Sequence, residues 1–229
     1  MNFLTNPYLI LFAQVVFIIG YVVAFFIDHF PWSLRVVGKK LNKFPLSTLR
    51  STQILMVNRF GAAFCFTSAG FLVDAGTTIN EFYLYFAITW GLLGTASFVY
   101  ITNWKIVFKF LANNMLRVTI VNPDVKNLKF SLKYTLLNYP FIFNTLGASI
   151  PILSASFFPE YRGLLLQLGF VFNSISSILL VFVLEPIFMN HIGNDELEEA
   201  DFYHQKFIIS KTILLFMFSG LGFFCYLLT

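Results

Sequence analysis

The chain has 229 residues, of which 58% are hydrophobic and only 11% are charged. Soluble domains carry about 25% charged residues, because their surfaces need polar cover. A soluble domain of this size could not hide so much apolar surface, whereas a bilayer accepts roughly 20 apolar residues per span. The composition therefore predicts an all-α, polytopic membrane helix bundle and excludes both a soluble enzyme and a nucleic-acid binder.

Six apolar segments follow one another along the chain, and we expect them to form one transmembrane domain over residues 1–229. The expected spans are about 8–27, 52–73, 82–101, 136–158, 163–189 and 207–228. Lys and Arg gather between the first and second spans and between the third and fourth, and such an excess marks the cytoplasmic side. Both termini are therefore predicted to face outward.

The two basic loops, residues 31–44 and 104–118, have a helical pattern of their own. In the second loop, basic and amide residues recur every four positions on one face, opposite an apolar face; the first face holds Lys105, Lys109, Asn113 and Arg117, and the other holds Ile106, Phe110 and Val118. This pattern favours an amphipathic helix in the membrane interface, with its bases toward anionic lipid headgroups. Inside-facing charge without a helix explains both loops equally well.

Arg59 is the most conspicuous polar residue within an apolar segment. It lies about eight residues into the second span, or roughly 12 Å from the inner end. A central Arg costs about 2.5 to 3.5 kcal/mol on insertion scales, so a bound anion, an acidic partner or a water-filled cleft must offset it. A side chain that snorkels to the interface is the alternative. Lys211 lies about four residues inside the last span, in the same inner half, where snorkelling explains it more easily.

Acidic residues near the ends of spans are candidate counter-charges for these two cations. Glu185 lies near the inner end of the fifth span, and an interfacial acid explains it equally well. Asp28 ends the first span on the inner side, and Asp74 ends the second on the outer side. Both also fit the simpler interpretation of residues that mark a span boundary.

Neutral polar side chains repeat at helical spacing in three spans, so each set lies on one helical face. The sets are Asn58, Gly61, Cys65 and Ser68; Tyr134, Asn138, Thr145 and Ser149; and Gln167, Ser174 and Ser177. Helix–helix packing uses the same small and hydroxyl residues. Together with Arg59, the three sets favour a polar cleft inside the bundle.

No arrangement of residues typical of catalysis or metal binding is present in the sequence. The histidines, His29, His191 and His204, fall in or beside loops, and Cys65 and Cys225 fall in apolar runs. The sequence holds no metalloprotease, hydrolase, P-loop or dinucleotide-binding motif. We therefore predict neither catalytic residues nor a metal or cofactor, and a protein that is not an enzyme.

Three stretches carry family information through their order and spacing. The first is Trp32-Ser33-Leu34-Arg35-Val36-Val37-Gly38, which follows Asp28. The second runs from Arg59 to Gly70-Phe71-Leu72-Val73-Asp74, and the third holds Tyr161-Arg162, Gln167, Asn173 and Glu185-Pro186. Together these stretches resemble the Amj family of bacterial lipid II flippases, over much of residues 28–74 and 160–186.

The resemblance implies that the chain moves lipid II, an undecaprenyl-diphosphate-linked peptidoglycan precursor, from the inner to the outer leaflet. This step serves cell-wall synthesis and cell shape, and it places the chain in the bacterial plasma membrane. The diphosphate needs cations and the sugars need amide or hydroxyl partners. The expected substrate-binding residues are Arg59, Lys211, Arg35, Arg162, Asn58, Gln167, Asn173 and Asn138, with Glu185, Asp74 and Asp28 as coupling or counter-charges.

The energetics permit such a movement without ATP, and we expect the membrane potential, with the cytoplasm negative, to assist it. Each elementary charge that crosses 100 mV is worth about 2.3 kcal/mol, so a headgroup with two negative charges gains roughly 4 to 5 kcal/mol as it moves outward. The expected partners are lipid II and anionic membrane lipids, with no nucleic acid. Six spans offer little room to enclose a large headgroup, so a homodimer remains an alternative to a monomer.

Three other classes of function remain open from the sequence. An ion-coupled small-solute transporter needs a deep titratable acid, whereas Glu185 is shallow. A membrane-embedded lipid-modifying enzyme needs paired acids, or a His–acid pair, at one depth. A non-catalytic membrane scaffold would bind partners through the acidic residues at 194–201.

Overall fold

The computed structural model describes residues 6–121, 139–179, 182–183, 186, 188–190 and 197–229, and in these ranges the chain is helical without a strand. The main helices are α1 (Pro7–Ile27), α2 (His29–Lys40), α3 (Phe44–Asp74), α4 (Ile79–Thr102), α5 (Trp104–Phe110), α6 (Tyr139–Phe157), α7 (Arg162–Leu179) and α9 (Leu197–Leu228). A π-helical turn, Leu111–Met115, follows α5, and a short 3-10 turn, Pro159–Tyr161, precedes α7. The predicted all-helical fold class is therefore confirmed.

Four helical segments are long and apolar enough to cross a membrane: Pro7–Lys40, Phe44–Asp74, Ile79–Thr102 and His204–Leu228. The first of these joins α1 and α2, which are separated only by a turn at Asp28. Helices α6 and α7 lie within the fourth predicted span and the first part of the fifth, and parts of both spans fall outside the described residues. The membrane-helix character is thus supported, while the count of six spans stays a prediction.

The ends of the helices follow from local sequence. The Asn6 side chain accepts a hydrogen bond from the Tyr8 N–H at 3.0 Å and caps α1, and Pro7 occupies the first turn. Thr78 and Glu81 form a reciprocal capping box that starts α4. These caps replace hydrogen bonds that the first turn of a helix cannot make within itself.

Two helices begin well before their apolar segments. The helix α3 starts at Phe44 rather than near 52, and α9 starts at Leu197 rather than near 207. Hydropathy detects only the apolar part of such a helix, whereas Leu, Glu and Ala at 197–200 are themselves strong helix formers. The acidic segment that we expected to be a loop is therefore helical from Leu197 onward.

The expected helix over 104–118 is shorter and differently built. Its α-helical part ends at Phe110, and Arg117 has a left-handed backbone with φ 56°. Because a π turn intervenes, Asn113 and Arg117 do not continue the face of Lys105 and Lys109. Lys109 and Phe110 are both exposed, while Trp104 and Phe108 pack inward.

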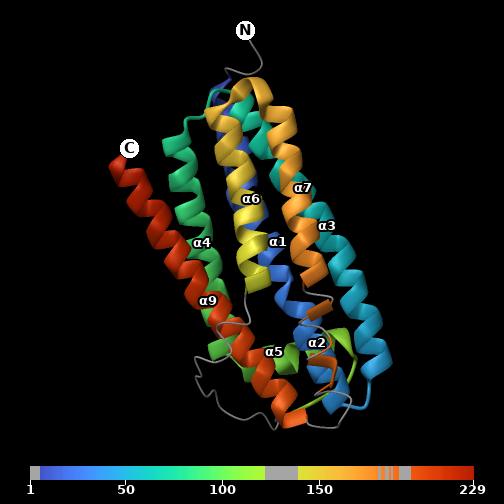
Figure 1. The fold of residues 1–229 in the computed structure, drawn as a ribbon. Coiled ribbons are helices and arrows are strands. Elements are labelled where there is room, and N and C mark those ends of the chain that lie inside the picture. Colours follow the sequence, from blue (N-terminus) through green and yellow to red (C-terminus); the bar gives the residue numbers. More distant parts are fainter. Residues whose placement is uncertain (1–5, 122–138, 180–181, 184–185, 187, 191–196) are drawn as a thin grey trace.

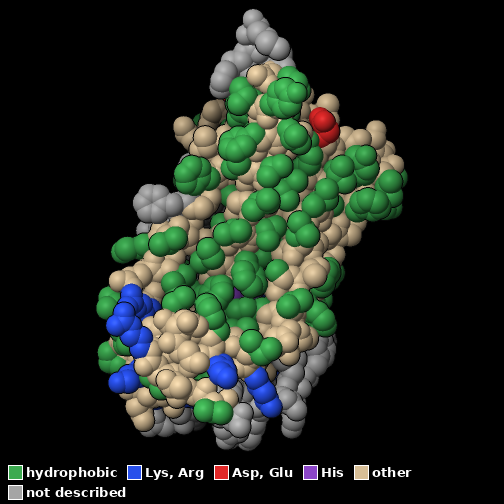
Figure 2. Space-filling view, turned by 180° about the vertical axis from the view of Figure 1, so that it is seen from behind, with side chains coloured by type: hydrophobic (Ala, Val, Ile, Leu, Met, Phe, Trp, Pro, Cys, Tyr) green, Lys and Arg blue, Asp and Glu red, His purple; other side chains and the backbone are tan. Residues whose placement is uncertain are grey.

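The long helices α1, α3, α4, α6, α7 and α9 run along a common direction (Figure 1). The beginning of α1 and the end of α9 lie at one end, which we call the terminal end, and α2 and α5 lie at the opposite end. Lys and Arg side chains gather at this second end, which we call the basic end, while the face in Figure 2 is otherwise largely hydrophobic. Helices α4 and α9 pack along one another, as do α6 and α7.

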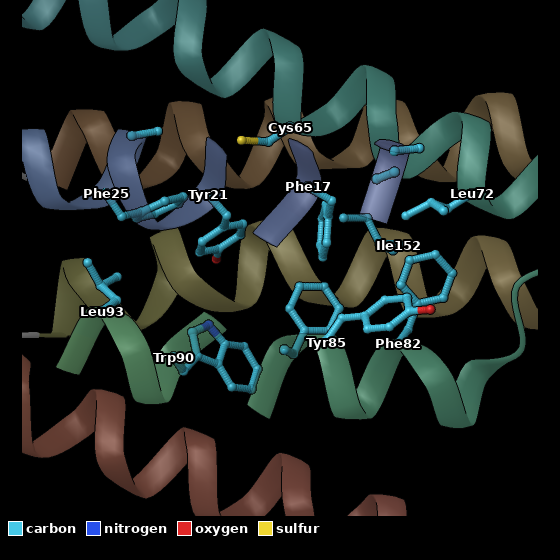
Figure 3. Packing of buried hydrophobic residues seen from close by; sticks show 14 of the residues in the cluster. Phe17, Tyr21, Phe25, Cys65, Leu72, Phe82, Tyr85, Trp90, Leu93 and Ile152 are labelled. Atoms are coloured by element: carbon cyan, nitrogen blue, oxygen red, sulfur yellow. The ribbon is translucent and has the colours of Figure 1, made fainter. Parts of the chain in front are cut away.

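An aromatic core holds α1 and α4 together near the terminal end (Figure 3). Phe17 is fully buried and meets Phe82 and Phe86 edge-on, with ring centroids 6.2 and 5.6 Å apart. Phe86 stacks on Trp90 at 5.2 Å. Such ring pairs fix the relative position of two helices, because their preferred geometries are few.

Candidate functional site

The first helix breaks at Asp28, and this break organises the most polar region of the interior. Helix α1 ends at Ile27 and α2 begins at His29, so Asp28 sits in the turn between them. The last carbonyls of a helix lack intrahelical donors and carry the negative end of its dipole. A cation at this position is therefore favoured, and Lys211 of α9 supplies it.

Lys211 is only 3% exposed and reaches the last turn of α1. Its Nζ donates to the Phe25 carbonyl oxygen at 3.3 Å and lies 3.4 Å from Nδ1 of His29. Its charge also acts on the Asp28 carboxylate, which is partly buried at the same break. Since burial of an isolated ammonium is costly, the carboxylate and the carbonyl together make this position tolerable.

The hydrogen bonds of His29 define its tautomer. Because the Lys211 ammonium can only donate, Nδ1 of His29 accepts and its proton resides on Nε2. Nε2 lies 2.7 Å from the Ser97 hydroxyl of α4, to which it donates. His29 is thus a neutral imidazole, 2% exposed, that links α9 to α4 through α2.

One turn further along α2, Ser33 is the centre of a second group of hydrogen bonds. Its hydroxyl donates to the His29 carbonyl oxygen at 2.8 Å and accepts from the Tyr100 hydroxyl of α4 at 2.5 Å. Its single proton is then used, so the contact of 2.7 Å with Nε2 of His204 requires His204 to donate. Ser33 is fully buried, so each of these contacts compensates for lost hydration.

Helix α3 also contacts the break between α1 and α2. Nδ2 of Asn58 donates to Oδ1 of Asp28 at 2.5 Å, which places this turn of α3 level with the break. Arg59 follows in the same turn of the helix, but its side chain lies outside the described part of the structure. We call the set at this break the junction network: Asp28, His29, Ser33, Asn58, Ser97, Tyr100, His204 and Lys211.

The part of α9 that faces this network is unusually polar for a buried helix. Six of its residues between 204 and 212 are polar and buried: His204, Gln205, Lys206, Ser210, Lys211 and Thr212. His204 and Lys211 are seven positions apart, so they share one face of the helix. Charged and polar groups at such positions are costly and mark functional regions in membrane proteins.

Three of the residues expected to act in a site therefore come together: Asp28, Asn58 and Lys211. Arg35 lies on the next turn of α2, half-buried, with its guanidinium 5.8 Å from the centre of the Trp32 ring. Trp32 packs edge-on against Phe188, at a centroid distance of 5.0 Å. Arg35 is thus placed near the basic end by a cation–π contact.

Two other expected residues pair with one another, away from the junction network. Nε of Arg162 lies 2.9 Å from Oδ1 of Asp74, where α3 ends and α7 begins. Their side chains are 50% and 36% exposed, respectively. The pair joins α3 to α7 near the terminal end, so Asp74 is the counter-charge of Arg162 rather than of a cation in the network.

Of the remaining expected residues, only the Gln167 side chain lies in the described part of the structure, and no contact joins it to the junction network. Gln167 is exposed on α7. Asn138 and Glu185 lie outside the described residues, and the side chain of Asn173 lies outside the described part of α7. The polar row on α3 mostly serves packing, because Gly61 faces Ala24 and Cys65 faces Gly20 of α1.

Sequence reasoning missed His29, Ser33, Ser97, Tyr100 and His204 as members of a site. The histidines were expected in or beside loops, whereas both described ones are buried within helices. One signal was available, since the spacing of seven between His204 and Lys211 places them on one helical face.

The junction network can hold an anion or exchange a proton, because it combines a buried ammonium, a carboxylate and two imidazoles. Among the described residues, no three His, Cys, Asp or Glu side chains gather into a metal-binding group.

No family model matches the chain, and the comparisons with curated proteins and with solved structures found no similar protein.

Proposed function

We propose that this chain is a flippase that carries the anionic headgroup of lipid II from the inner to the outer leaflet of the bacterial plasma membrane. One observation carries the proposal: a lysine ammonium, Lys211, is held inside an apolar helix bundle at the end of another helix. A diphosphate is the complementary ligand for such a cation, since charge-assisted hydrogen bonds are the strongest that a side chain forms.

The neighbours of Lys211 suit the rest of the headgroup. Ser33, Asn58 and Ser97 bring hydroxyl and amide groups to the same network, and sugars are bound by such partners. The polyprenyl tail can remain in the bilayer while the headgroup moves along the bundle. A lateral path between helices would therefore suffice, with the expected six spans forming its walls.

The distribution of charge supports entry from the basic end. Lys105 and Lys109 are exposed there, and Lys39 and Lys40 end α2 at the same place. Exposed bases attract anionic lipid headgroups by about 1 kcal/mol per charge near the surface. With the basic end toward the cytoplasm, the membrane potential favours outward movement of an anion.

Transport of labelled lipid II in proteoliposomes tests this proposal. We expect Lys211→Met to abolish transport, while Lys109→Met, which removes one of several exposed bases at the basic end, should slow it without abolishing it. Arg59→Ala tests the neighbouring cation of α3 in the same assay. Unchanged transport in Lys211→Met, from protein that elutes as wild type, would refute the role of this lysine.

A second measurement tests the biological role. Expression of the chain should restore growth to a bacterium depleted of its main lipid II flippase, and Lys211→Met should fail to do so at equal membrane abundance. Absence of rescue by the wild-type chain would contradict lipid II as the substrate.

An ion-coupled transporter is the second candidate, and Asp28 favours it. The sequence offered only Glu185 as an acid within a span, whereas Asp28 lies partly buried beside Lys211 and His29. Uptake of small solutes driven by a proton gradient, without movement of lipid II, would favour this candidate over the flippase.

A further inference from the structure

Asp28 and Lys211 act as counter-charges for one another at the break between α1 and α2. Asp28 is held from α3 by Asn58, while Lys211 is held by the Phe25 carbonyl oxygen and by His29. The ammonium is almost fully buried, so a ligand anion can reach it only by taking over part of this arrangement. Among the described groups whose charge acts on the ammonium, the Asp28 carboxylate has the same sign of charge as that anion.

We propose that a ligand phosphate replaces Asp28 as the counter-charge of Lys211 and that Asp28 then takes up one proton. Anion binding and proton binding are thereby coupled at one site. This inference rests on the proposed function, because it takes the lipid diphosphate as the ligand.

Electrostatics gives the reason for the coupling. A carboxylate and a phosphate that share one lysine repel one another, and the repulsion is strong where water is largely excluded. Protonation of the carboxylate removes this repulsion and leaves the ammonium to the phosphate. By linkage, an anion that favours the protonated carboxyl must itself bind more tightly when a proton is available.

The hydrogen bonds around Asp28 accommodate the protonated form. Asn58 donates to Oδ1, so a proton on Oδ2 leaves this bond in place. In the described part of the chain, the other polar groups of the network come from three elements. They are His29 with Ser33 from α2, Ser97 and Tyr100 from α4, and Lys211 with His204 from α9.

The exchange involves one proton and no electrons, and the proton comes from water and returns to it. One proton from bulk water bonds to Oδ2 of Asp28, which ends its electrostatic attraction to Lys211, and Nζ of Lys211 donates a hydrogen bond to a phosphate oxygen. Lysine keeps its own proton throughout and no electron is transferred. When the headgroup leaves, the carboxyl returns its proton to water and is again the counter-charge of Lys211.

The test measures binding of farnesyl-diphospho-N-acetylglucosamine to the full-length protein in phosphatidylcholine nanodiscs. Both phosphates of this probe are esterified, so the probe itself does not titrate near neutral pH. Calorimetry in two buffers of different protonation enthalpy gives the number of protons taken up per ligand. We expect close to one proton, and an affinity that rises by up to about tenfold for each unit that the pH falls.

A matched pair of variants assigns the proton to a residue. Asp28→Asn should bind without proton uptake, with an affinity that no longer depends on pH and that exceeds the wild-type affinity at neutral pH. Asp74→Asn removes the exposed acid at the other end of α3 and should behave as wild type. Proton uptake that persists unchanged in Asp28→Asn would overturn the inference.

Infrared difference spectroscopy on the wild-type protein gives a test that does not depend on whether the Asp28→Asn variant folds. Ligand binding to wild-type protein should produce the C=O stretching band of a protonated carboxylic acid. An imidazolium signal without that band would instead assign the proton to His29 or His204 and overturn the inference.

The two proposals fail in different ways. Binding of the probe without proton uptake refutes the coupling and leaves the flippase proposal standing. Failure of the wild-type protein to bind the probe at any pH refutes both.

Discussion

Two regions of this bundle are both largely buried but differ in what they bury. The aromatic core near the terminal end packs Phe17, Phe82, Phe86 and Trp90 with few polar atoms. The junction network, where α1 breaks, buries an ammonium and two imidazoles and holds a carboxylate partly buried beside them. The phenylalanine rings need only shape complementarity, whereas each polar group in the network needs a specific partner. Stability therefore explains the first region, while the cost of the second suggests a function.

The largest expected effect on stability comes from the aromatic core. Phe86→Ala removes the ring that contacts both Phe17 and Trp90, and such truncations cost about 3–5 kcal/mol. Thermal unfolding in detergent should report this loss, while lipid transport per folded molecule stays within about twofold of wild type. A large loss of transport by fully folded protein would remove the distinction between the two regions.

Lys211→Met should lower the free energy of unfolding by about 3 kcal/mol, slightly less than Phe86→Ala, because it leaves a partly buried carboxylate without its cation. Transport should be lost. The double variant Asp28→Asn/Lys211→Met should regain most of the stability without regaining transport. If the double variant is no more stable than Lys211→Met alone, the two residues are not counter-charges.

Ser33→Ala removes three contacts without changing any charge. The Tyr100 hydroxyl and the His204 imidazole each lose a partner in a buried setting, at a cost of about 1–3 kcal/mol. Transport should fall rather than vanish, since Lys211 is retained. Ser47→Ala, on α3, is the control, because the Ser47 hydroxyl donates to the Phe44 carbonyl oxygen within its own helix.

Arg162→Gln should have the smallest effect. Its ion pair with Asp74 is half exposed, and such pairs contribute at most about 1 kcal/mol. Unfolding in low and high salt measures the contribution directly, because salt screens exposed charges. A loss of transport comparable to that of Lys211→Met would show that polar contacts at the terminal end also act in function.

The apolar helices could be predicted closely from the sequence, and the polar site only in part. The segment predicted at 8–27 became Pro7–Ile27, because a long apolar run has few alternatives in a bilayer. Lys211, Asp28 and Asn58 were named as candidates because polar residues in apolar runs are visible without a structure. His204 was not, because its contact with Ser33 joins residues 171 positions apart and exists only once α9 packs on α2.

The separation of the junction partners along the chain has a consequence for biosynthesis. His29 and Lys211 are 182 positions apart, so the first helix enters the membrane long before its lysine has been made. Asp28 and its hydrogen-bond donor Asn58 are both made early, whereas the cation arrives only with α9. The network around Asp28 can therefore be completed only after the last described helix has been made and packed.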